Sequence, residues 1–462
     1  MTDKRDRLVR LSNDCLVIMC GRTGLRLGTT FLQGIDAEYG HSAEGLWQMG
    51  EKRLGERLEL RKSTFYAPPK RGQEDEKPPF RAVAIDLDSK SVEEAGIGDR
   101  LVAKLNYTGG GAEMLWPEGY TEAEKLKDQI SAVLDQAGAD SVRNFILFHG
   151  TSHGTGSGVA SWVVDYLRSE YGQSREQARN LLTFTVTPSG NTREALPYKD
   201  VEAISGPSYY NTVLTLNTLL GVRPGQPPVR PGAFRTIVTT MDNPATARVW
   251  REQTGKYPSS SDYAEINWLM ARAALNITSP LRFGPTDLGN VFVYFSRTHD
   301  ATLTTPAISP VVPTGDDAPF QLAYDGLFHQ RLCQSDGEQP EQLYFLFRGP
   351  VDRAGLRHVH DLLHDRFGFH TELYSCVPEP CPGIPVEFAA MFVPDDVPPA
   401  LKGVIENARE NLDIGAHLRD YEGWGYKPEL LRDNVEALDA RLRDGALPER
   451  PVRPTAEQTA EV

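Results

Sequence analysis

Residues 148–158 read FHGTSHGTGSG, a run of glycines, hydroxyl side chains and histidines. They follow an apolar run, NFILFH, with the length of a buried strand. From Val159 onward apolar residues recur at helical spacing, and Gly172 stands where such a helix would end. The glycines therefore lie between a strand and a helix N-terminus, where free backbone N–H groups and the helix dipole favour a phosphate. A tight connection without a ligand is the alternative.

Outward from this stretch, the same alternation of strands and helices continues. Apolar, β-branched runs separated by helical patterns occupy residues 15–20, 80–87, 144–149, 181–186 and 234–240. This alternation predicts an α/β fold with a mostly parallel sheet. Two further strand candidates, at 342–349 and 385–393, indicate a second α/β or α+β unit. An apolar stripe at Leu431, Val435, Leu438 and Leu442 predicts a late helix that packs on the rest.

Two familiar phosphate motifs are excluded by spacing. No Lys-Ser or Lys-Thr pair follows the glycines at 154–158, so this is not a P-loop. The first strand is followed by CGRTGLRLG, whose glycines do not give the G-x-G-x-x-G spacing of a dinucleotide fold. Two glycine loops after two strands of one sheet can nevertheless hold one ligand from two sides.

Composition narrows the range of partners. The chain has 462 residues, with 49 Lys and Arg against 63 Asp and Glu, a net charge of −14 that disfavours nucleic acid and anionic membranes. No apolar run reaches the length of a membrane span, and the N-terminus lacks a signal-peptide core, so we expect a cytoplasmic protein. The five cysteines lack zinc-site spacing and are expected to be reduced, although Cys376 and Cys381 could bridge in an oxidising compartment.

Several motifs, in order along the chain, together resemble the tubulin/FtsZ superfamily. They are CGRTGLRLGTTFLQGIDAEYG, FRAVAIDLD, GGGAEMLWPEGYTEAEKL, FILFHGTSHGTGSG, VTPSG, SYYNTVLTLNTLL, MDNPATARVW, DYAEINWLMARAALNITSPLRF, FRG and LRDYEGWGYKPELLRDNVEALDARL. The likeness is closer to tubulin than to FtsZ and is that of a divergent, prokaryotic-type member.

The resemblance implies a domain order. A nucleotide-binding domain would span residues 1–258 and a core helix 259–283. A second, activation domain would follow at 284–400, and surface helices at 401–446. The proline-rich segment 447–462 is expected to be disordered.

The resemblance also assigns site residues for GTP or GDP and Mg²⁺. Two loops would face the phosphates. They are the first loop, with Gly21, Arg22, Thr23 and Gly24, and the signature loop within residues 148–158, with Gly154, Thr155, Gly156, Ser157 and Gly158. Arg26 stands where the family usually has a glutamine near the base. Asp86 and Asp88 match an acidic pair, and Asp88 could hold Mg²⁺ through water. Asn243 and Asn267 would read guanine, since an amide both donates and accepts, and Tyr263 would stack on the base.

Three departures from the family pattern concern mechanism. Ser152 and His153 replace two signature-loop glycines, and residues 113–115 of the third loop are less polar than usual. Asp287 matches the last aspartate of the seventh loop, but the carboxylate expected three residues later is Asn290, which can position water without acting as a base. The loop at 312–319 is shorter than the lateral-contact loop of microtubule tubulins, and the acidic tail is missing.

These features predict a GTP-binding protein that assembles head to tail into filaments, alone or with a second tubulin-like subunit. Asp287 or Asn290 of one subunit would complete the site of the next, with hydrolysis slow or absent. A nonpolymerising, nucleotide-gated binding module is the first alternative. A dinucleotide-dependent oxidoreductase is the second, and Arg22 or Arg26 could also have changed the preferred base.

Overall fold

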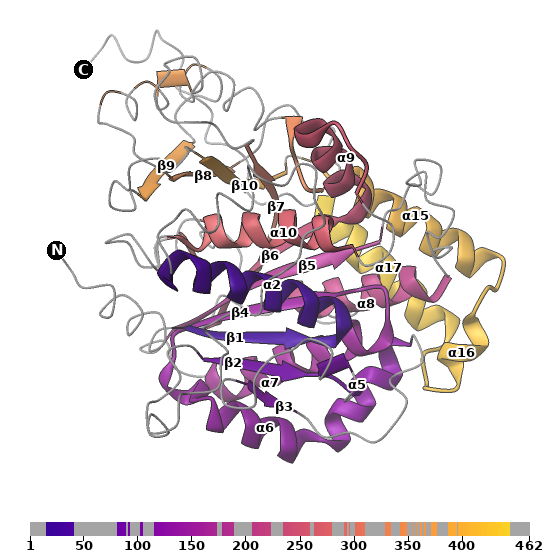
Figure 1. Cartoon of the computed structure of the whole chain (residues 1–462). Helices are drawn as coiled ribbons and strands as arrows, with labels where there is room; N and C mark the ends of the chain where they lie inside the picture. The colour runs from indigo at the N-terminus through magenta and orange to yellow at the C-terminus, as the bar shows by residue number, and fades with distance from the viewer. Residues whose placement is uncertain are drawn as a thin grey trace, which may run out of the picture.

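The computed structural model describes residues 15–40, 81–88, 91–92, 102–104, 115–172, 178–188, 206–222, 234–258, 263–279, 291–292, 295, 301–309, 329–333, 342–348, 354, 358, 361–362, 365, 371–376, 387–394 and 396–443. Within these ranges the predicted α/β class is confirmed (Figure 1). Ten strands form one sheet in the order β3-β2-β1-β4-β5-β6-β7-β10-β8-β9.

The strands of this sheet include every strand expected from the sequence. Their bounds are β1 (Cys15–Cys20), β2 (Ala82–Ile85), β3 (Val102–Lys104), β4 (Asn144–Gly150), β5 (Arg179–Thr187), β6 (Phe234–Asp242), β7 (Ala301–Ile308), β8 (Gln342–Arg348), β9 (Thr371–Cys376) and β10 (Glu387–Val393). Neighbours from β3 to β7 are parallel, whereas β10 is antiparallel to both β7 and β8.

The described helices connect and cover these strands. Their bounds are α2 (Gly21–Gly40), α5 (Trp116–Lys125), α6 (Lys127–Gln136), α7 (Ala160–Tyr171), α8 (Gly206–Leu220), α9 (Asn243–Thr254), α10 (Ala264–Ile277), α15 (Pro399–Asp413), α16 (Leu418–Glu422) and α17 (Pro428–Arg443). Two short helical turns are also present, η2 (Ala139–Ser141) and the π-helical η3 (Thr155–Val159).

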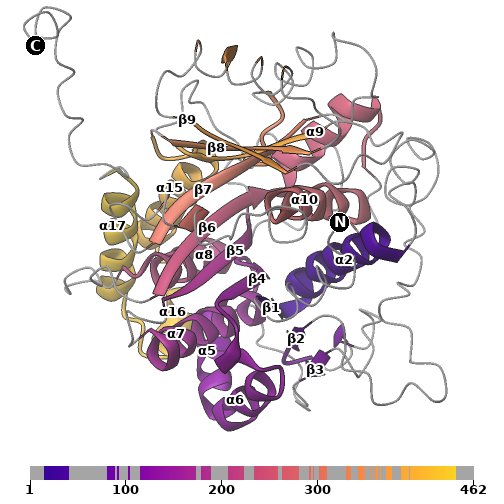
Figure 2. The same ribbon diagram turned by 90° about the vertical axis from the view of Figure 1, so that its left-hand side faces the viewer.

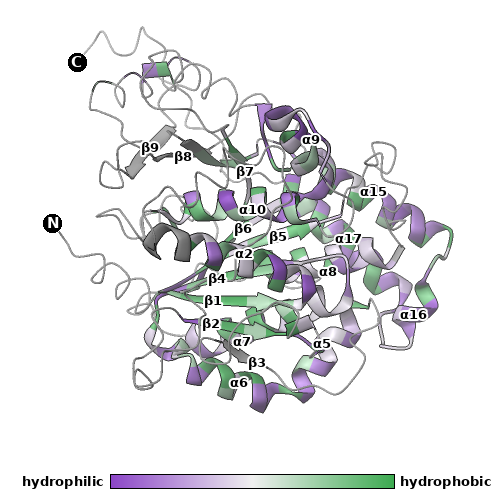
Figure 3. Ribbon diagram, in the orientation of Figure 1, coloured by the Kyte–Doolittle hydropathy of each residue, from purple (hydrophilic) through white to green (hydrophobic). Residues whose placement is uncertain are grey.

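Alternate residues of β1 serve two separate cores, one on each face of the sheet. Val17 and Met19 pack into a cluster with α2, α9 and α10. Leu16 and Ile18 pack into a second cluster with α5 to α8 and the C-terminal helices. Figure 2 shows α2 and α10 on one side of the sheet and α7 and α17 on the other. Because β1 is buried on both faces, its sequence is apolar throughout rather than alternating (Figure 3).

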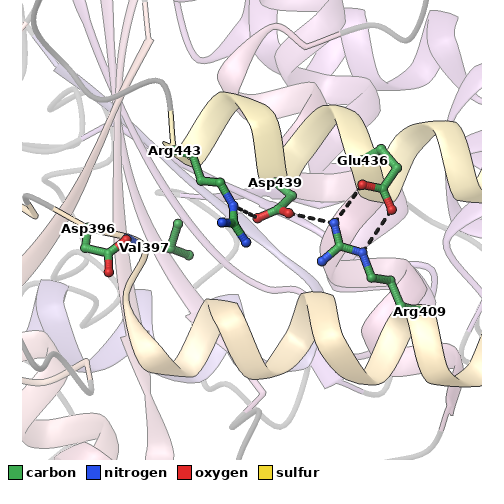
Figure 4. A network of polar contacts seen from close by, with 6 residues as sticks. All are labelled: Asp396, Val397, Arg409, Glu436, Asp439 and Arg443. Atoms are coloured by element: carbon green, nitrogen blue, oxygen red, sulfur yellow. Dashed lines mark hydrogen bonds and ion pairs between the residues drawn. The ribbon is translucent and has the colours of Figure 1, made fainter.

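The two C-terminal helices α15 and α17 are joined by an ion-pair network at their outer side (Figure 4). Arg409 of α15 donates to Glu436 at 2.7 Å and to Asp439 at 2.6 Å on α17. Arg443 donates to the other oxygen of Asp439 at 2.8 Å. Hydrogen bonds from Arg409 lower the pKa of Glu436, and this network fixes the two helices beside α8. The apolar stripe of α17 faces inward as predicted, with Leu431, Val435 and Leu438 buried.

The division into domains stays a prediction. Strands from both predicted units belong to one continuous sheet through the β6–β7 pair, in which Thr236 lies opposite Ala301. Residues 447–462, expected to be disordered, lie outside the described residues. Among the described helices we find none with the length and apolar character that a membrane span needs.

Candidate functional site

The carboxyl ends of β1, β2, β4, β5 and β6 meet at one edge of the sheet. Cys20, the last residue of β1, lies opposite His149 of β4, and Thr187 of β5 lies opposite Asp242 of β6. In open parallel sheets, ligands bind outside this edge. The edge receives the residues that follow the strands, namely Gly21, Asp86, Thr151 and Asn243.

Two glycine loops touch at this edge through their backbones. Gly21 has a φ of 68°, in the left-handed region that glycine adopts without strain. A Cβ atom on Gly21 would come within 2.6 Å of the Cα atom and 2.7 Å of the backbone nitrogen of Gly156. The close approach therefore requires glycine, and it brings together the first loop and the signature loop.

The signature loop closes on itself before α7 begins. The backbone N–H of Ser157 donates to the carbonyl oxygen of His153 at 3.0 Å, and its hydroxyl donates to the same oxygen at 2.7 Å. Ser157 lies within the turn η3, which runs directly into α7, so the helix N-terminus faces the edge of the sheet. N-terminal N–H groups of a helix lack intrahelical partners and bind anions well. The Ser157 side chain is buried, whereas His153 is exposed.

Helix α5 packs directly on the signature loop. A Cβ atom on Gly158 would overlap the carbonyl oxygen of Trp116, and one on Gly119 would overlap that of Gly154. The loop is thus held between α5 and β1. Of the atypical third-loop residues, Leu115 is half-buried at the start of α5, and residues 113–114 lie outside the described residues.

The rest of the first loop forms the beginning of α2. Arg22 is exposed, and Thr23 and Arg26 are half-buried. Thr23 lies against Gly150 at the end of β4, and Gly24 packs on the backbone of the same strand. All of the described first-loop residues therefore lie on the helix that adjoins the signature loop.

The acidic pair follows β2. Asp86 is buried, its Oδ1 accepts the backbone N–H of Asp88 at 3.0 Å, and its Oδ2 has no hydrogen-bond partner. Burial raises the pKa of Asp86 to about 6 and the charge of Asp88 adds to the rise, while the Asp88 N–H and Arg22 oppose it. The Oδ2 atom of Asp88 accepts a hydrogen bond from Ser91 at 2.9 Å.

This pair fits a Mg²⁺ site completed by a nucleotide. Protein-bound Mg²⁺ is commonly held by one or two carboxylates together with phosphate oxygens and water. Asp86 offers a buried, unpaired carboxylate oxygen close to the glycine loops. Within the described residues no group of three or more His, Cys, Asp or Glu side chains could hold a metal alone. Phosphate oxygens and water would complete the coordination at this pair.

The residues predicted to read the base lie at the starts of α9 and α10. The side chain of Asp242 accepts the N–H of Ala245 at 2.6 Å and caps α9, so Asn243 begins the helix with a half-buried side chain. Tyr263 precedes α10 with a φ of 56°, rare for a residue with a side chain, and packs half-buried against the core. Its carbonyl accepts the N–H of Asn267 at 2.8 Å, which places both residues in the first turn of α10.

Two polar residues at this edge were missed from the sequence. His149 is buried at the end of β4, and its Nε2 atom lies 2.9 Å from the Thr185 hydroxyl. Burial lowers the pKa of His149 to about 4, so its imidazole is neutral at pH 7. Asn211 of α8 is buried and donates to the carbonyl oxygen of Ser152 in the signature loop at 3.0 Å. Both are polar residues within otherwise apolar stretches, and this interruption was the signal in the sequence that could have indicated them.

The predicted catalytic residues Asp287 and Asn290 lie outside the described residues, as does the loop at 312–319. The residues that follow them in the chain are described in part. Val291, Phe292 and Phe295 are helical and buried in the core beside α10.

Part of the chain matches a known protein family. Residues 14–216 match the Tubulin/FtsZ family, GTPase domain. The matched segment contains both glycine loops, the acidic pair and Asn211, and it ends before Asn243, Tyr263 and Asn267. The match shows that this segment is similar to the GTPase domain of the Tubulin/FtsZ family, and a domain of that kind binds a guanine nucleotide.

Proposed function

Because residues 14–216 match the GTPase domain of the Tubulin/FtsZ family, we propose that this chain binds GTP and GDP with Mg²⁺ and assembles head to tail into filaments. The contact between Gly21 and Gly156 carries the proposal most directly. It brings two glycine loops together at a helix N-terminus, where a phosphate chain has N–H donors on two sides. We place the chain nearer to tubulin than to FtsZ and in the cytoplasm.

In this proposal the nucleotide lies along the edge of the sheet. The phosphates contact the first loop and the signature loop, through residues 21–24 and 154–158. Asp86 and Asp88 hold Mg²⁺, which neutralises phosphate charge. Asn243 and Asn267 read guanine and Tyr263 stacks on it, a role to which its left-handed backbone lends support, because such strain is concentrated at ligand sites.

In this proposal filaments form because each subunit's nucleotide site is completed by residues of the next subunit. Asp287 and Asn290 of one subunit would lie against the nucleotide of the next, so that each contact joins two different surfaces. Such heterologous contacts need not close into a ring and then produce filaments. The subunits are copies of this chain, or alternate with a second tubulin-like subunit. Because Asn290 replaces a carboxylate, hydrolysis is slow or absent.

Phosphate release tests the contact between subunits. We expect slow or undetectable release from the wild type, since an amide does not activate water as a base does. Asn290→Asp restores a carboxylate and is expected to raise the rate at least about tenfold, in a manner that increases with protein concentration. Asp287→Ala is expected to abolish the release that remains. The measurement is phosphate release from GTP across a dilution series.

Two results would contradict this assignment. One is fast, cooperative release by the wild type that persists in Asp287→Ala. The other is a gain in Asn290→Asp that does not depend on protein concentration, because a residue acting within its own subunit needs no neighbour.

A further inference from the structure

Asn211 of α8 joins three segments that are distant in the sequence. Its Oδ1 atom accepts the backbone N–H of Trp116 at 2.7 Å and the hydroxyl of Tyr421 at 2.6 Å. Its Nδ2 atom donates to the carbonyl oxygen of Ser152 at 3.0 Å. One amide thus connects the start of α5, the signature loop and the C-terminal helix α16.

We propose that Asn211 is a positioning residue for the phosphate-binding signature loop, and that Tyr421 holds Asn211 in the orientation this requires. The inference rests on the proposed function, in which this loop contacts the phosphates of GTP. It adds that the C-terminal segment, more than two hundred positions later in the chain, contributes to nucleotide affinity through one hydrogen-bonded side chain.

The burial of the group makes its orientation specific. Asn211 and Tyr421 are both 0% exposed, so water does not compete for their hydrogen bonds. An amide rotated by half a turn would present its NH₂ group to the N–H of Trp116 and its oxygen to the carbonyl of Ser152. Both contacts would then be repulsive. The hydroxyl of Tyr421 shares its one hydrogen between Oδ1 of Asn211 at 2.6 Å and the carbonyl oxygen of Pro207 at 3.1 Å, and the shorter contact adds to the preference for the observed orientation.

A second contact between α8 and the loop supports this role. The hydroxyl groups of Thr212 and Thr151 lie 2.8 Å apart, and the backbone N–H of Thr151 donates to Val186 of β5 at 3.0 Å. Consecutive residues of α8 therefore hold consecutive residues of the loop, Thr151 and Ser152. These two precede His153 and the glycines at 154–158, so their position sets where the phosphate-binding part of the loop begins.

The C-terminal segment reaches the same place by a separate route. The ring of Tyr426 meets that of Trp116 edge-on, with 5.8 Å between centroids. Trp116 in turn lies directly against Gly158 of the loop. The segment at 421–426 therefore supports the signature loop both through Asn211 and through α5.

Two residues of α8 serve as matched controls. The hydroxyl of Tyr210 donates to the carbonyl oxygen of Ala416 at 3.3 Å, a contact to the C-terminal segment like that of Tyr421 but away from the loop. Asn217 is buried and donates to the carbonyl oxygen of Asn434 on α17 at 2.9 Å, also away from the loop. Loss of either group weakens the packing of the same helices while leaving Asn211 in place.

The test compares the affinities of GTP and guanosine, measured by competition with a fluorescent GTP analogue on the full chain. Tyr421→Phe removes the hydroxyl that contacts both Asn211 and the carbonyl oxygen of Pro207, and it is expected to lower GTP affinity about 3- to 10-fold. Asn211→Ala is expected to lower it at least about 10-fold. Guanosine, which has the base and ribose without phosphates, should lose less than about 2-fold in both variants. Tyr210→Phe and Asn217→Ala should leave the ratio of the two affinities unchanged.

The outcomes separate this inference from the proposed function. Equal losses for GTP and guanosine, or an equal change of the ratio in the control variants, would show a merely structural role and overturn the inference alone. Should Asn211→Ala fail to fold, the ratio of the GTP affinity to the guanosine affinity in Tyr421→Phe decides between the two roles. Failure of the wild type to bind GTP would overturn the proposed function and this inference with it.

Discussion

Gly21→Ala is expected to lower the affinity for GTP at least about 30-fold. The substitution has two costs, because a side chain at a φ of 68° is strained by about 1–2 kcal/mol and its Cβ would lie 2.6 Å from the Cα of Gly156. Relief of the overlap must move backbone, since neither atom of contact belongs to a flexible side chain, and overpacking of this kind costs about 1–3 kcal/mol. The loop that moves is the one proposed to hold the phosphates. Calorimetric titration with GTP measures the loss.

Gly255→Ala is the matched control for that substitution. Gly255 follows α9 with a φ of 70°, and a Cβ atom there would meet nothing within 4 Å. It therefore shares the backbone strain of Gly21 and lacks the contact between loops. We expect a stability loss of about 1–2 kcal/mol with GTP affinity unchanged within about 2-fold. Equal losses of affinity in the two variants would show that the loop contact is not what matters.

Asp86→Asn is expected to stabilise the nucleotide-free protein and to weaken the binding of GTP in the presence of Mg²⁺. The buried Oδ2 atom of Asp86 has no hydrogen-bond partner, and burial raises the pKa of this carboxyl from 3.8 to about 6. At 1.36 kcal/mol per pH unit, ionisation of this group at pH 7 costs up to about 3 kcal/mol of folding stability. An amide keeps an acceptor for the Asp88 N–H and carries no charge, so chemical denaturation should show a gain of about 1–3 kcal/mol.

The pH dependence has a definite sign. Because the pKa of Asp86 is higher in the folded than in the unfolded protein, the folded state binds the additional proton between about pH 4 and pH 6. The contribution of Asp86 to stability is therefore fully present below pH 3.8 and is lost as the pH rises through about 6. The gain from Asp86→Asn should accordingly be larger at pH 7.5 than at pH 4.5.

The binding measurement completes this prediction. If Asp86 holds Mg²⁺, the variant loses at least about 10-fold in GTP affinity with Mg²⁺ present and much less with a chelator, because only the metal-dependent part of binding is removed. Asp88→Asn provides a comparison within the same acidic pair. A variant that is less stable than the wild type, or that loses as much GTP affinity with a chelator as with Mg²⁺ present, would contradict the role assigned to Asp86.

The central strands could be predicted from the sequence, and β7 could not. Runs such as CLVIMC are apolar throughout because both of their faces are buried, so composition alone indicates them. β7 reads ATLTTPAI, with threonines and a proline that do not suggest a buried strand. Thr304 of β7 is paired within the sheet, because its hydroxyl lies 3.0 Å from that of Thr239 of β6. Only the neighbouring strand makes this sequence suitable for the interior.

The same reason explains which parts of the candidate site the sequence could indicate. The glycine loops are local motifs, and the spacing of Gly154, Gly156 and Gly158 was sufficient to predict their position at a helix N-terminus, where the phosphate site is proposed. Asn211 gains its role from Trp116 and Tyr421, which are 95 and 210 positions away. No spacing rule relates such residues, since the fold alone brings them together. The exposed position of His153 makes it a surface feature of the loop, beside the buried His149.

The most direct test of nucleotide-dependent, head-to-tail assembly is sedimentation of the wild-type chain with GTP, a nonhydrolysable GTP analogue, GDP, ATP or no nucleotide. We expect a pellet above a critical protein concentration with GTP and with the analogue, and little or none with GDP, ATP or no addition. A pellet with ATP in place of GTP would assign a different base preference to the site. No pellet under any nucleotide condition would contradict filament assembly and would favour a nonpolymerising nucleotide-gated module.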